Sequence, residues 1–270
     1  MKTKIIYIGT SHTIIESLTH YSAFELSTII CEEKRITYEY KKTIQRLKLN
    51  LIPFTTKLDF EKIIETFKPE EFVFIIYQLD LIVPAHLANN YHFFNLHAGS
   101  IKTNRGAHPI IWSILNGDTS TELTFHKINE KIDQGIIIGK YSVPIHQKDD
   151  ATSIKRKMET GLPMLFNSLN LFLKGDINGE ICNAGIYRKP IQEKDYTINV
   201  FVDNRALIEN KIKSQKQYKG AIVWFNNVKY NVTKLLEWNE VITYTEKIVI
   251  HENKIEIQRM NDVFTLELFK

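Results

Sequence analysis

The sequence has little of what would tie it to a special environment. Two cysteines in 270 residues are too few for a disulfide scaffold. Both follow apolar residues, so Cys31 and Cys182 are predicted to be reduced, buried thiols. No apolar stretch approaches the ~20 residues that a membrane helix needs, and the apolar run near the N-terminus is too short for a signal peptide. We therefore expect a cytoplasmic protein with no membrane partner.

Charge of one sign is also scarce. The 35 Lys and Arg residues face 31 Asp and Glu residues, a formal net charge of +4. That excess is too small to indicate a nucleic-acid partner unless it is concentrated in one region. Hydrophobic residues make up 43% and charged residues 24% of the chain, as in ordinary globular proteins, which excludes disordered and fibrous classes.

The order of apolar and polar segments predicts an α/β fold with a mostly parallel sheet. Polar segments of helical length and spacing separate four short apolar runs. Further on, we expect a helix over 106–115 with Trp112 on its apolar side, and a long helical stretch from about residue 150 to Gly175 that is broken or kinked at Pro163. The predicted strands are 4–8, 26–31, 49–52 ending at Pro53, 72–76, 93–97, 123–128 and 136–143.

The pattern changes in the last third of the chain. A polar stretch over 187–199 reads as a linker, and short alternating runs follow it, which is typical of a small antiparallel β domain. We place the boundary near residue 190, giving a Rossmann-like domain over 1–190 and a β-rich domain over 191–270. The predicted strands of the second domain are 221–225, 228–232, 241–244, 248–251, 255–258 and 263–268.

The turn after the first predicted strand, Gly9-Thr10-Ser11, is a weak candidate for a phosphate site. It lacks the G-x-G-x-x-G spacing of a dinucleotide fingerprint, so an ordinary tight turn is the better interpretation. Hydroxyl groups beside a helix N-terminus can still contact a phosphate.

Asn95-Leu96-His97 is a stronger candidate. Residues two apart on a strand share a face, so Asn95 and His97 are expected to project together at the end of a strand. A carboxamide beside an imidazole can stabilise an oxyanion and move a proton. In the turn Asp133-Gln134-Gly135, the carboxylate can orient His97 or favour its charged form. Spacing alone leaves open that these residues are only sheet-edge and turn residues.

Five groups of residues, taken together, resemble the folate-dependent formyltransferases: 95–97, 104–113, Gly117, 124–126 and 133–135. The resemblance covers about residues 1–175 in fold pattern. It implies a Rossmann-like N-terminal domain, N10-formyltetrahydrofolate as formyl donor, and a catalytic set of Asn95, His97 and Asp133. The sequence departs from the family at 98–102, where Ala-Gly-Ser-Ile-Lys replaces a Pro-Ser-Leu-Leu-Pro-like run, so the shape of this loop is expected to differ.

The resemblance also implies a mechanism and a set of contacts. An acceptor amine attacks the formyl carbon, Asn95 and a protonated His97 stabilise the oxyanion, and Asp133 keeps His97 charged. Neither cysteine has partners at metal spacing, so no metal is expected. The expected pterin contacts are Gln78, Leu79, Asp80, Leu81, Leu87, Ile128, Glu130 and Lys131. The expected nucleotide-sugar contacts are Thr10, Ser11 and Arg105 at the diphosphate and Tyr77, Tyr218 or Trp224 at the thymine.

Three branches of the family differ in their acceptor. Glycinamide ribonucleotide formyltransferases are essentially one domain, which the residues beyond Pro190 disfavour. Methionyl-tRNA formyltransferases are usually longer and carry a basic insertion that is absent here after 31–35, and residues 196–270 hold 11 Lys and Arg against 9 Asp and Glu, a poor footprint for tRNA. Sugar N-formyltransferases fit best.

The predicted substrate is therefore a dTDP-4-amino-4,6-dideoxyhexose used for surface polysaccharide (O-antigen, lipopolysaccharide) synthesis, and a homodimer through the second domain is expected from the resemblance. The sequence does not choose the sugar, the nucleotide or the ring position. A methionyl-tRNA formyltransferase and a folate-binding protein that has lost catalysis stay open as alternatives.

Overall fold

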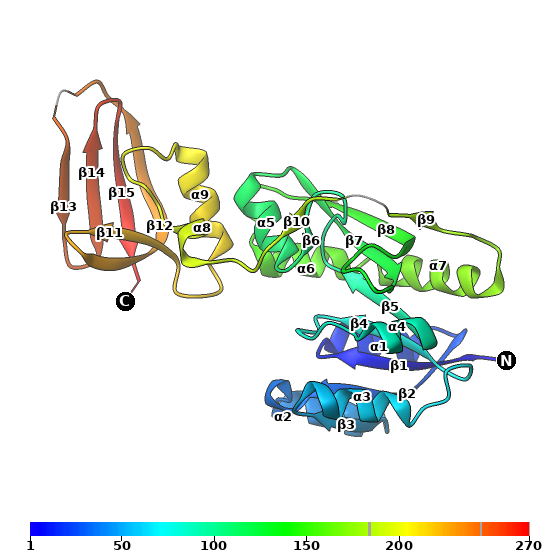
Figure 1. The fold of residues 1–270 in the computed structure, drawn as a ribbon. Coiled ribbons are helices and arrows are strands. Elements are labelled where there is room, and N and C mark those ends of the chain that lie inside the picture. Colours follow the sequence, from blue (N-terminus) through cyan, green and yellow to red (C-terminus); the bar gives the residue numbers. More distant parts are fainter. Residues whose placement is uncertain (183–184, 244, 270) are drawn as a thin grey trace. The chain divides into compact units, whose positions relative to one another are not determined.

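A computed structural model of the chain describes residues 1–182, 185–243 and 245–269, and it divides into two compact units (Figure 1). Unit 1 comprises Met1–Gly106, Glu122–Ser142 and Lys157–Tyr187. Unit 2 comprises Ala107–Thr121, Val143–Arg156 and Arg188–Lys270. The division by contacts thus assigns two earlier segments to unit 2, and the predicted boundary near residue 190 stays a prediction.

The first sheet has eight strands in the order β3-β2-β1-β4-β5-β7-β8-β9. Its first five strands are parallel, whereas β7 runs antiparallel to β5 and β9 to β8. The strand order reverses between β1 and β4, and open α/β sheets bind ligands beyond the carboxyl ends of the strands at such a point. The predicted α/β fold is confirmed. The strands are β1 (Thr3–Gly9), β2 (Phe24–Glu32), β3 (Asn50–Phe54), β4 (Val73–Tyr77), β5 (His92–His97), β7 (Ser120–Lys127), β8 (Ile136–Pro144) and β9 (Glu180–Ile181).

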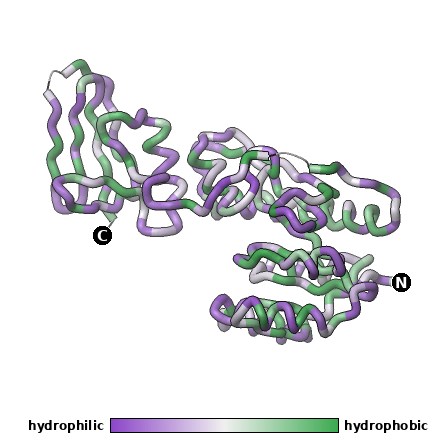
Figure 2. Tube along the Cα trace, in the orientation of Figure 1, coloured by the Kyte–Doolittle hydropathy of each residue, from purple (hydrophilic) through white to green (hydrophobic). Residues whose placement is uncertain are grey.

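Strands β1 and β4 are buried along most of their length, because helices shield this part of the sheet from water. Hydrophobic and hydrophilic residues are interspersed along the chain (Figure 2). Phe60 and Ile64 of α3 and Leu87 of α4 pack with strand residues in one apolar cluster. Phe166 of α7 contacts Phe24 at the start of β2. The helical segments of this part of the chain are α1 (His12–His20), η1 (Glu33–Arg35), α2 (Tyr38–Arg46), α3 (Lys57–Glu65), α4 (Ala85–Asn90), α6 (Ala151–Glu159) and α7 (Leu162–Lys174).

Prolines account for one wrong prediction and one confirmed prediction. The third strand does not end at Pro53, because β3 is the edge strand and a missing N–H is tolerated there. The long helix does break before Pro163, which occupies the first turn of α7, where its ring fits without strain. Gly175 ends α7 in the left-handed conformation, as expected.

The helix predicted over 106–115 begins three residues later. Gly106 belongs to the short strand β6 (Arg105–Gly106), which pairs with β10 (Tyr187–Arg188), and α5 runs over Pro109–Asn116. Gly117 caps the C-terminus of α5 in the left-handed conformation, with a φ of 72°. Trp112 is not simply on an apolar face: its indole N–H donates to the Lys189 carbonyl oxygen at 3.0 Å, and the Arg188 guanidinium lies 5.1 Å from its ring centre.

Unit 2 contains a five-stranded antiparallel sheet in the order β11-β12-β15-β14-β13 (Figure 1). The predicted antiparallel β structure in this part of the chain is therefore confirmed. Helix α9 packs on it through Ile208 and Ile212. The strand predicted over 241–244 is wrong for 241–243, which follow the end of β12; residue 244 lies outside the described residues. The predicted linker contains the short helix α8 (Glu193–Tyr196). The other elements are α9 (Arg205–Ser214), β11 (Ala221–Phe225), β12 (Val228–Glu240), β13 (Lys247–Ile250), β14 (Lys254–Arg259) and β15 (Asp262–Leu268).

The prediction for the cysteines is confirmed: Cys31 and Cys182 are both buried, and neither forms a disulfide. Cys182 packs with Ile101 and Ile137, which anchors the loop that follows β5. Across the described ranges, no helix is both long and apolar enough to cross a bilayer.

Candidate active site

Two polar side chains project from the end of β5 toward the antiparallel strand β7. Asn95 and His97 share one face of β5, as expected from their spacing. The register pairs Asn95 with His126 and His97 with Thr124. Strand pairing therefore places His126 beside Asn95 at the carboxyl end of the parallel sheet.

Asp133 reaches the same place from the turn between β7 and β8. Its φ is 49°, a left-handed conformation that non-glycine residues adopt rarely and often at functional sites. Asn129 braces the turn, because its Nδ2 donates to the Gln134 carbonyl oxygen at 3.1 Å and its Oδ1 accepts from the Lys131 amide at 2.9 Å. The structure thus brings the three predicted catalytic residues together.

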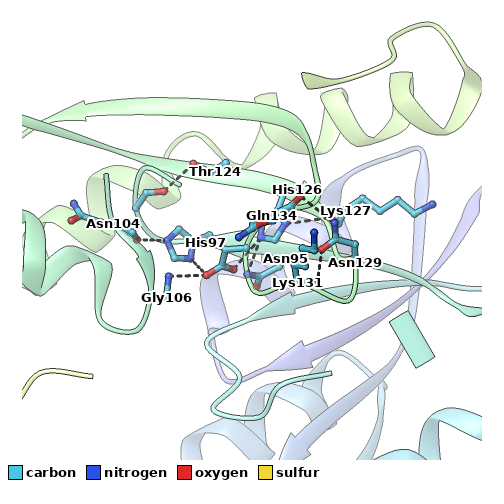
Figure 3. Close-up of polar contacts among 12 residues, drawn as sticks. Asn95, His97, Asn104, Gly106, Thr124, His126, Lys127, Asn129, Lys131 and Gln134 are labelled. Carbon is cyan, nitrogen blue, oxygen red and sulfur yellow. Dashed lines mark hydrogen bonds and ion pairs between the residues drawn. The ribbon is translucent and has the colours of Figure 1, made fainter. Parts of the chain in front are cut away.

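His97 is held on both sides of its ring (Figure 3). Its Nε2 lies 2.8 Å from the Asn104 carbonyl oxygen, and its Nδ1 lies 3.6 Å from Asp133 Oδ2. The same carboxylate oxygen accepts from the Gly106 amide at 2.9 Å. The loop over 98–106 therefore supplies backbone partners on both sides of Arg105.

The tautomer of His97 follows from these contacts. A carbonyl oxygen only accepts, so Nε2 carries a hydrogen and donates it to Asn104. Nδ1 is then the atom that gains or loses a proton, and it faces the Asp133 carboxylate. The arrangement can accept a proton at Nδ1 and stabilise the resulting imidazolium.

Burial lowers the pKa of His97, and it outweighs the opposing attraction of the Asp133 carboxylate. Burial raises the pKa of Asp133, but the nearby His97 and His126 rings and the Gly106 amide together bring this pKa well below its usual range. Asp133 is thus ionised at neutral pH, and burial disfavours the charged form of His97. The resemblance implied that Asp133 keeps His97 charged; His97 is only 5% exposed, so its loss of hydration opposes that effect of Asp133.

The pH profile of catalysis should reflect this balance. If neutral His97 accepts a proton, kcat/KM falls on the acid side with a midpoint below about 6.5, the ordinary pKa of histidine. Asp133→Asn removes a charge that raises the pKa of His97, so the midpoint should move to still lower pH while turnover drops. An acid limb that moves upward in this variant would contradict the assignment of His97 as the titrating base.

The residues expected at the pterin gather around one apolar cluster. Leu87 is fully inside it, and the half-buried Leu79, Leu81 and Ile128 pack against it. The polar members of the set are exposed: Gln78, Asp80, Glu130 and Lys131. Asp80 forms an ion pair with Arg35 at 3.5 Å. Leu87 therefore supports the leucines that a flat ring could touch and has almost no exposed surface of its own.

Residues expected at the diphosphate have different surroundings. Ser11 is buried and caps α1, and its hydroxyl donates to Glu159 Oε1 at 3.2 Å. Thr10 precedes it and is half-buried. Arg105 is half-buried, its guanidinium lies 5.8 Å from the Tyr187 ring centre, and its Nε is buried without a hydrogen-bond partner. Arg105 is thus a cation that can accommodate an anion, whereas Ser11 is already engaged.

The aromatic residues expected at the thymine also differ. Tyr77 at the end of β4 is fully buried, so its ring offers no exposed face in this structure. Tyr218 and Trp224 belong to unit 2, where both side chains are exposed, and their contact with a base stays a prediction.

Sequence reasoning assigned no role to His126, to the Asn104 carbonyl or to the Gly106 amide. His126 could have been found from the register, since a strand antiparallel to β5 brings it opposite Asn95. The Asn104 carbonyl and the Gly106 amide belong to the backbone, so the side-chain types in the sequence do not predict their roles. Within the described residues there is no group of three or more His, Cys, Asp or Glu side chains that could hold a metal ion.

Comparison with known proteins identifies the family. A family model described as formyl transferase matches residues 4–165. A bifunctional polymyxin resistance protein of Wigglesworthia glossinidia brevipalpis is 36% identical over 90 residues, 33% of this chain and 14% of the relative. A methionyl-tRNA formyltransferase of Nitrosomonas europaea is 26% identical over 216 residues, 77% of this chain and 62% of the relative. The matches thus span less than two thirds of either relative.

Similarity in structure extends over the whole chain. An N-formyltransferase of Helicobacter canadensis, solved with folinic acid and dTDP-3-aminofucose, superposes with a TM-score of 0.69 and 17% identity, covering 100% of both chains. At this identity the likeness establishes the fold, while the family match covers more than half of the sequence, including Asn95, His97 and Asp133. This chain is a member of the formyl transferase family.

Proposed function

We propose that this protein is a folate-dependent N-formyltransferase whose acceptor is the amine of a nucleotide-linked amino sugar. The observation that carries the proposal is the convergence of Asn95, His97 and Asp133 at the end of the sheet. A carboxamide donor, an imidazole with a titrating nitrogen and a buried carboxylate are the groups that acyl transfer to an amine requires.

The residues present suit a folate donor. Leu79, Leu81 and Ile128 form a half-buried apolar surface on the cluster that contains Leu87, which suits a flat pterin ring. When bound, N10-formyltetrahydrofolate supplies a formyl carbon whose bond to nitrogen is exchanged for a bond to the acceptor amine. Gln78, Asp80, Glu130 and Lys131 border this surface in the proposal.

Each catalytic residue has one task in this proposal. The Asn95 carboxamide donates a hydrogen bond to the oxygen on which negative charge develops. His97 Nδ1 accepts the proton released by the attacking amine and returns it to the departing nitrogen, so no proton is gained or lost overall. Asp133 stabilises the imidazolium between these two transfers.

The choice of a sugar over tRNA is supported by the charges of unit 2. Several of its cations have carboxylate partners within the unit, which reduces the positive charge left to neutralise several phosphates. Lys211 contacts Asp203 at 2.6 Å and Lys216 contacts Asp150 at 3.1 Å. Four further pairs are Arg205 with Glu209, Lys229 with Glu193, Lys254 with Glu256 and Arg259 with Asp262.

A second candidate is formylation of methionyl-tRNA, favoured by the sequence match to the Nitrosomonas europaea enzyme. The deciding assay follows the absorbance change as N10-formyltetrahydrofolate becomes tetrahydrofolate, with dTDP- and UDP-linked amino sugars and methionyl-tRNA as acceptors. Turnover with an amino sugar supports the proposal, and the active sugars would show whether a dTDP-4-amino-4,6-dideoxyhexose of surface polysaccharide synthesis is the substrate. Turnover with tRNA alone would favour the second candidate, and none with any acceptor would favour a folate-binding protein without catalysis.

Arg105 is the proposed contact for the diphosphate. Arg105→Ala is expected to raise KM for the nucleotide sugar about 10-fold or more with a smaller change in kcat, because a charge-assisted hydrogen bond is lost. Arg105→Lys keeps the charge but not the planar contact with Tyr187, so it should rescue the KM only in part. An unchanged KM in Arg105→Ala would remove Arg105 from substrate binding.

A further inference from the structure

His126 is buried beside the proposed catalytic residues, and the residue is only 1% exposed. Its Nδ1 lies 3.2 Å from the Lys127 carbonyl oxygen, and its Nε2 lies 3.2 Å from Asn95 Nδ2 (Figure 3). Because a carbonyl oxygen only accepts, the hydrogen of a neutral ring belongs on Nδ1. Nε2 then presents a lone pair to the Asn95 carboxamide.

This lone pair determines which end of the Asn95 amide faces which neighbour. The NH2 group of Asn95 donates one hydrogen to Nε2 and keeps its second hydrogen for another acceptor. If the carboxamide turned over, its Oδ1 would face the Nε2 lone pair, and two acceptors would oppose each other. Without His126, nothing in this contact would prevent the amide from presenting oxygen where a donor is needed.

The Asp133 carboxylate is a second acceptor near His126 Nε2 and would favour the other tautomer of the ring. Asp133 Oδ1 lies 3.4 Å from His126 Nε2, slightly farther than Asn95 Nδ2. A hydrogen on Nε2 would donate to Asp133 and leave the Asn95 NH2 facing another donor. A hydrogen on Nδ1 satisfies both the Lys127 carbonyl and the Asn95 NH2 group, and this is the arrangement on which the proposal rests.

We propose that His126 is a positioning residue of the formyl transfer, acting through Asn95: its Nε2 holds the carboxamide with an N–H directed at the oxyanion. The proposal rests on the proposed function. A residue that fixes the rotamer of a catalytic group contributes in the transition state, so its loss should lower kcat and leave KM unchanged.

Two substitutions of His126 distinguish a positioning role from a role in packing alone. Gln places its amide where Nε2 lies and can accept from Asn95, so His126→Gln should stay within about 10-fold of the natural turnover, whereas His126→Phe, with no acceptor, should lose about 100-fold. His92→Gln, at the exposed start of β5, is the matched control and should be unchanged. Equal losses in the Gln and Phe variants would contradict positioning through an acceptor.

A double-substitution cycle gives the decisive comparison. If His126 acts through Asn95, adding His126→Phe to Asn95→Ala should cost little beyond Asn95→Ala alone. A full further 100-fold loss would overturn the proposal, because it would show that His126 acts independently. Melting temperatures of all variants identify those that fail to fold, and His126→Gln then keeps the comparison possible.

A readout independent of turnover separates this inference from the proposed function. NMR of nitrogen-labelled histidine in the whole protein should show the His126 ring with its hydrogen on Nδ1 and none on Nε2, and Asn95→Ala should shift the Nε2 resonance. A hydrogen on Nε2 would overturn the inference even if formyl transfer is observed. The expected tautomer without formyl transfer to any acceptor would leave the geometry intact and refute the proposed function.

Discussion

His97→Ala is expected to lower turnover at least about 100-fold, a loss comparable to that of an oxyanion donor. The variant has no group that can take the proton of the attacking amine, since the remaining partner, Asp133, is a strongly acidic carboxylate. Asn95→Ala should cause a similar loss by removing the N–H that meets the developing charge. Initial rates at saturating donor and acceptor measure both effects.

The control for His97→Ala concerns folding, because the side chain is buried and donates to the Asn104 carbonyl. Circular dichroism and the melting temperature should show a folded protein, with the loss confined to kcat. His97→Gln keeps a donor for Asn104 but has no titrating nitrogen, so it should stay folded and inactive. Near-natural turnover in either folded variant would remove His97 from the mechanism.

Gly135→Ala is expected to damage both stability and catalysis. A Cβ at this position would lie 1.6 Å from the Lys127 carbonyl oxygen, so the backbone must move. Overpacking of this kind typically costs about 1–3 kcal/mol of unfolding free energy. The same shift would disturb the turn that carries Asp133 and the carbonyl that fixes His126. Chemical denaturation and kcat, measured on the same preparation, test both parts.

Gly175 provides the matched control. It has a φ of 79° but no heavy atom within 4 Å of a built Cβ, so Gly175→Ala introduces only backbone strain, roughly 1–2 kcal/mol. Its kcat should be unchanged, because a Cβ at Gly175 contacts no residue of the turn that carries Asp133. If Gly135→Ala kept the natural kcat once folded, the placement of Asp133 by this close contact would be refuted.

The sequence predicts the side chains of the site well because strand spacing is a local property. Asn95 and His97 had to share a face of one strand, and the apolar run that precedes them predicts its burial. The meeting with Asp133 depends on a turn in a left-handed conformation, which residue type alone does not specify. His126 was part of the resemblance, but no role was assigned to it because that role depends on register with β5, a contact between residues 31 positions apart.

The other differences between prediction and structure arise from the surroundings of a residue in the fold, which local sequence patterns do not contain. Pro53 was expected to end its strand, yet an edge position has no ladder hydrogen bond to lose there. A carboxylate near His97 was expected to keep the ring charged, but complete burial has the larger effect on its pKa. The helix over 109–116 starts later than expected because residues 105–106 pair with β10 instead.

The most direct test of the proposed chemistry is the identity of the product. The purified protein is incubated with N10-formyltetrahydrofolate and dTDP-linked amino sugars, and mass spectrometry of the acceptor is compared with that from His97→Ala. The expected result is an acceptor that gains one formyl group on its amine with the natural protein, and at least about 100-fold less of it with the variant. Equal formylation by both proteins, or none of the amino sugars by the natural protein, would contradict the proposed role of this site.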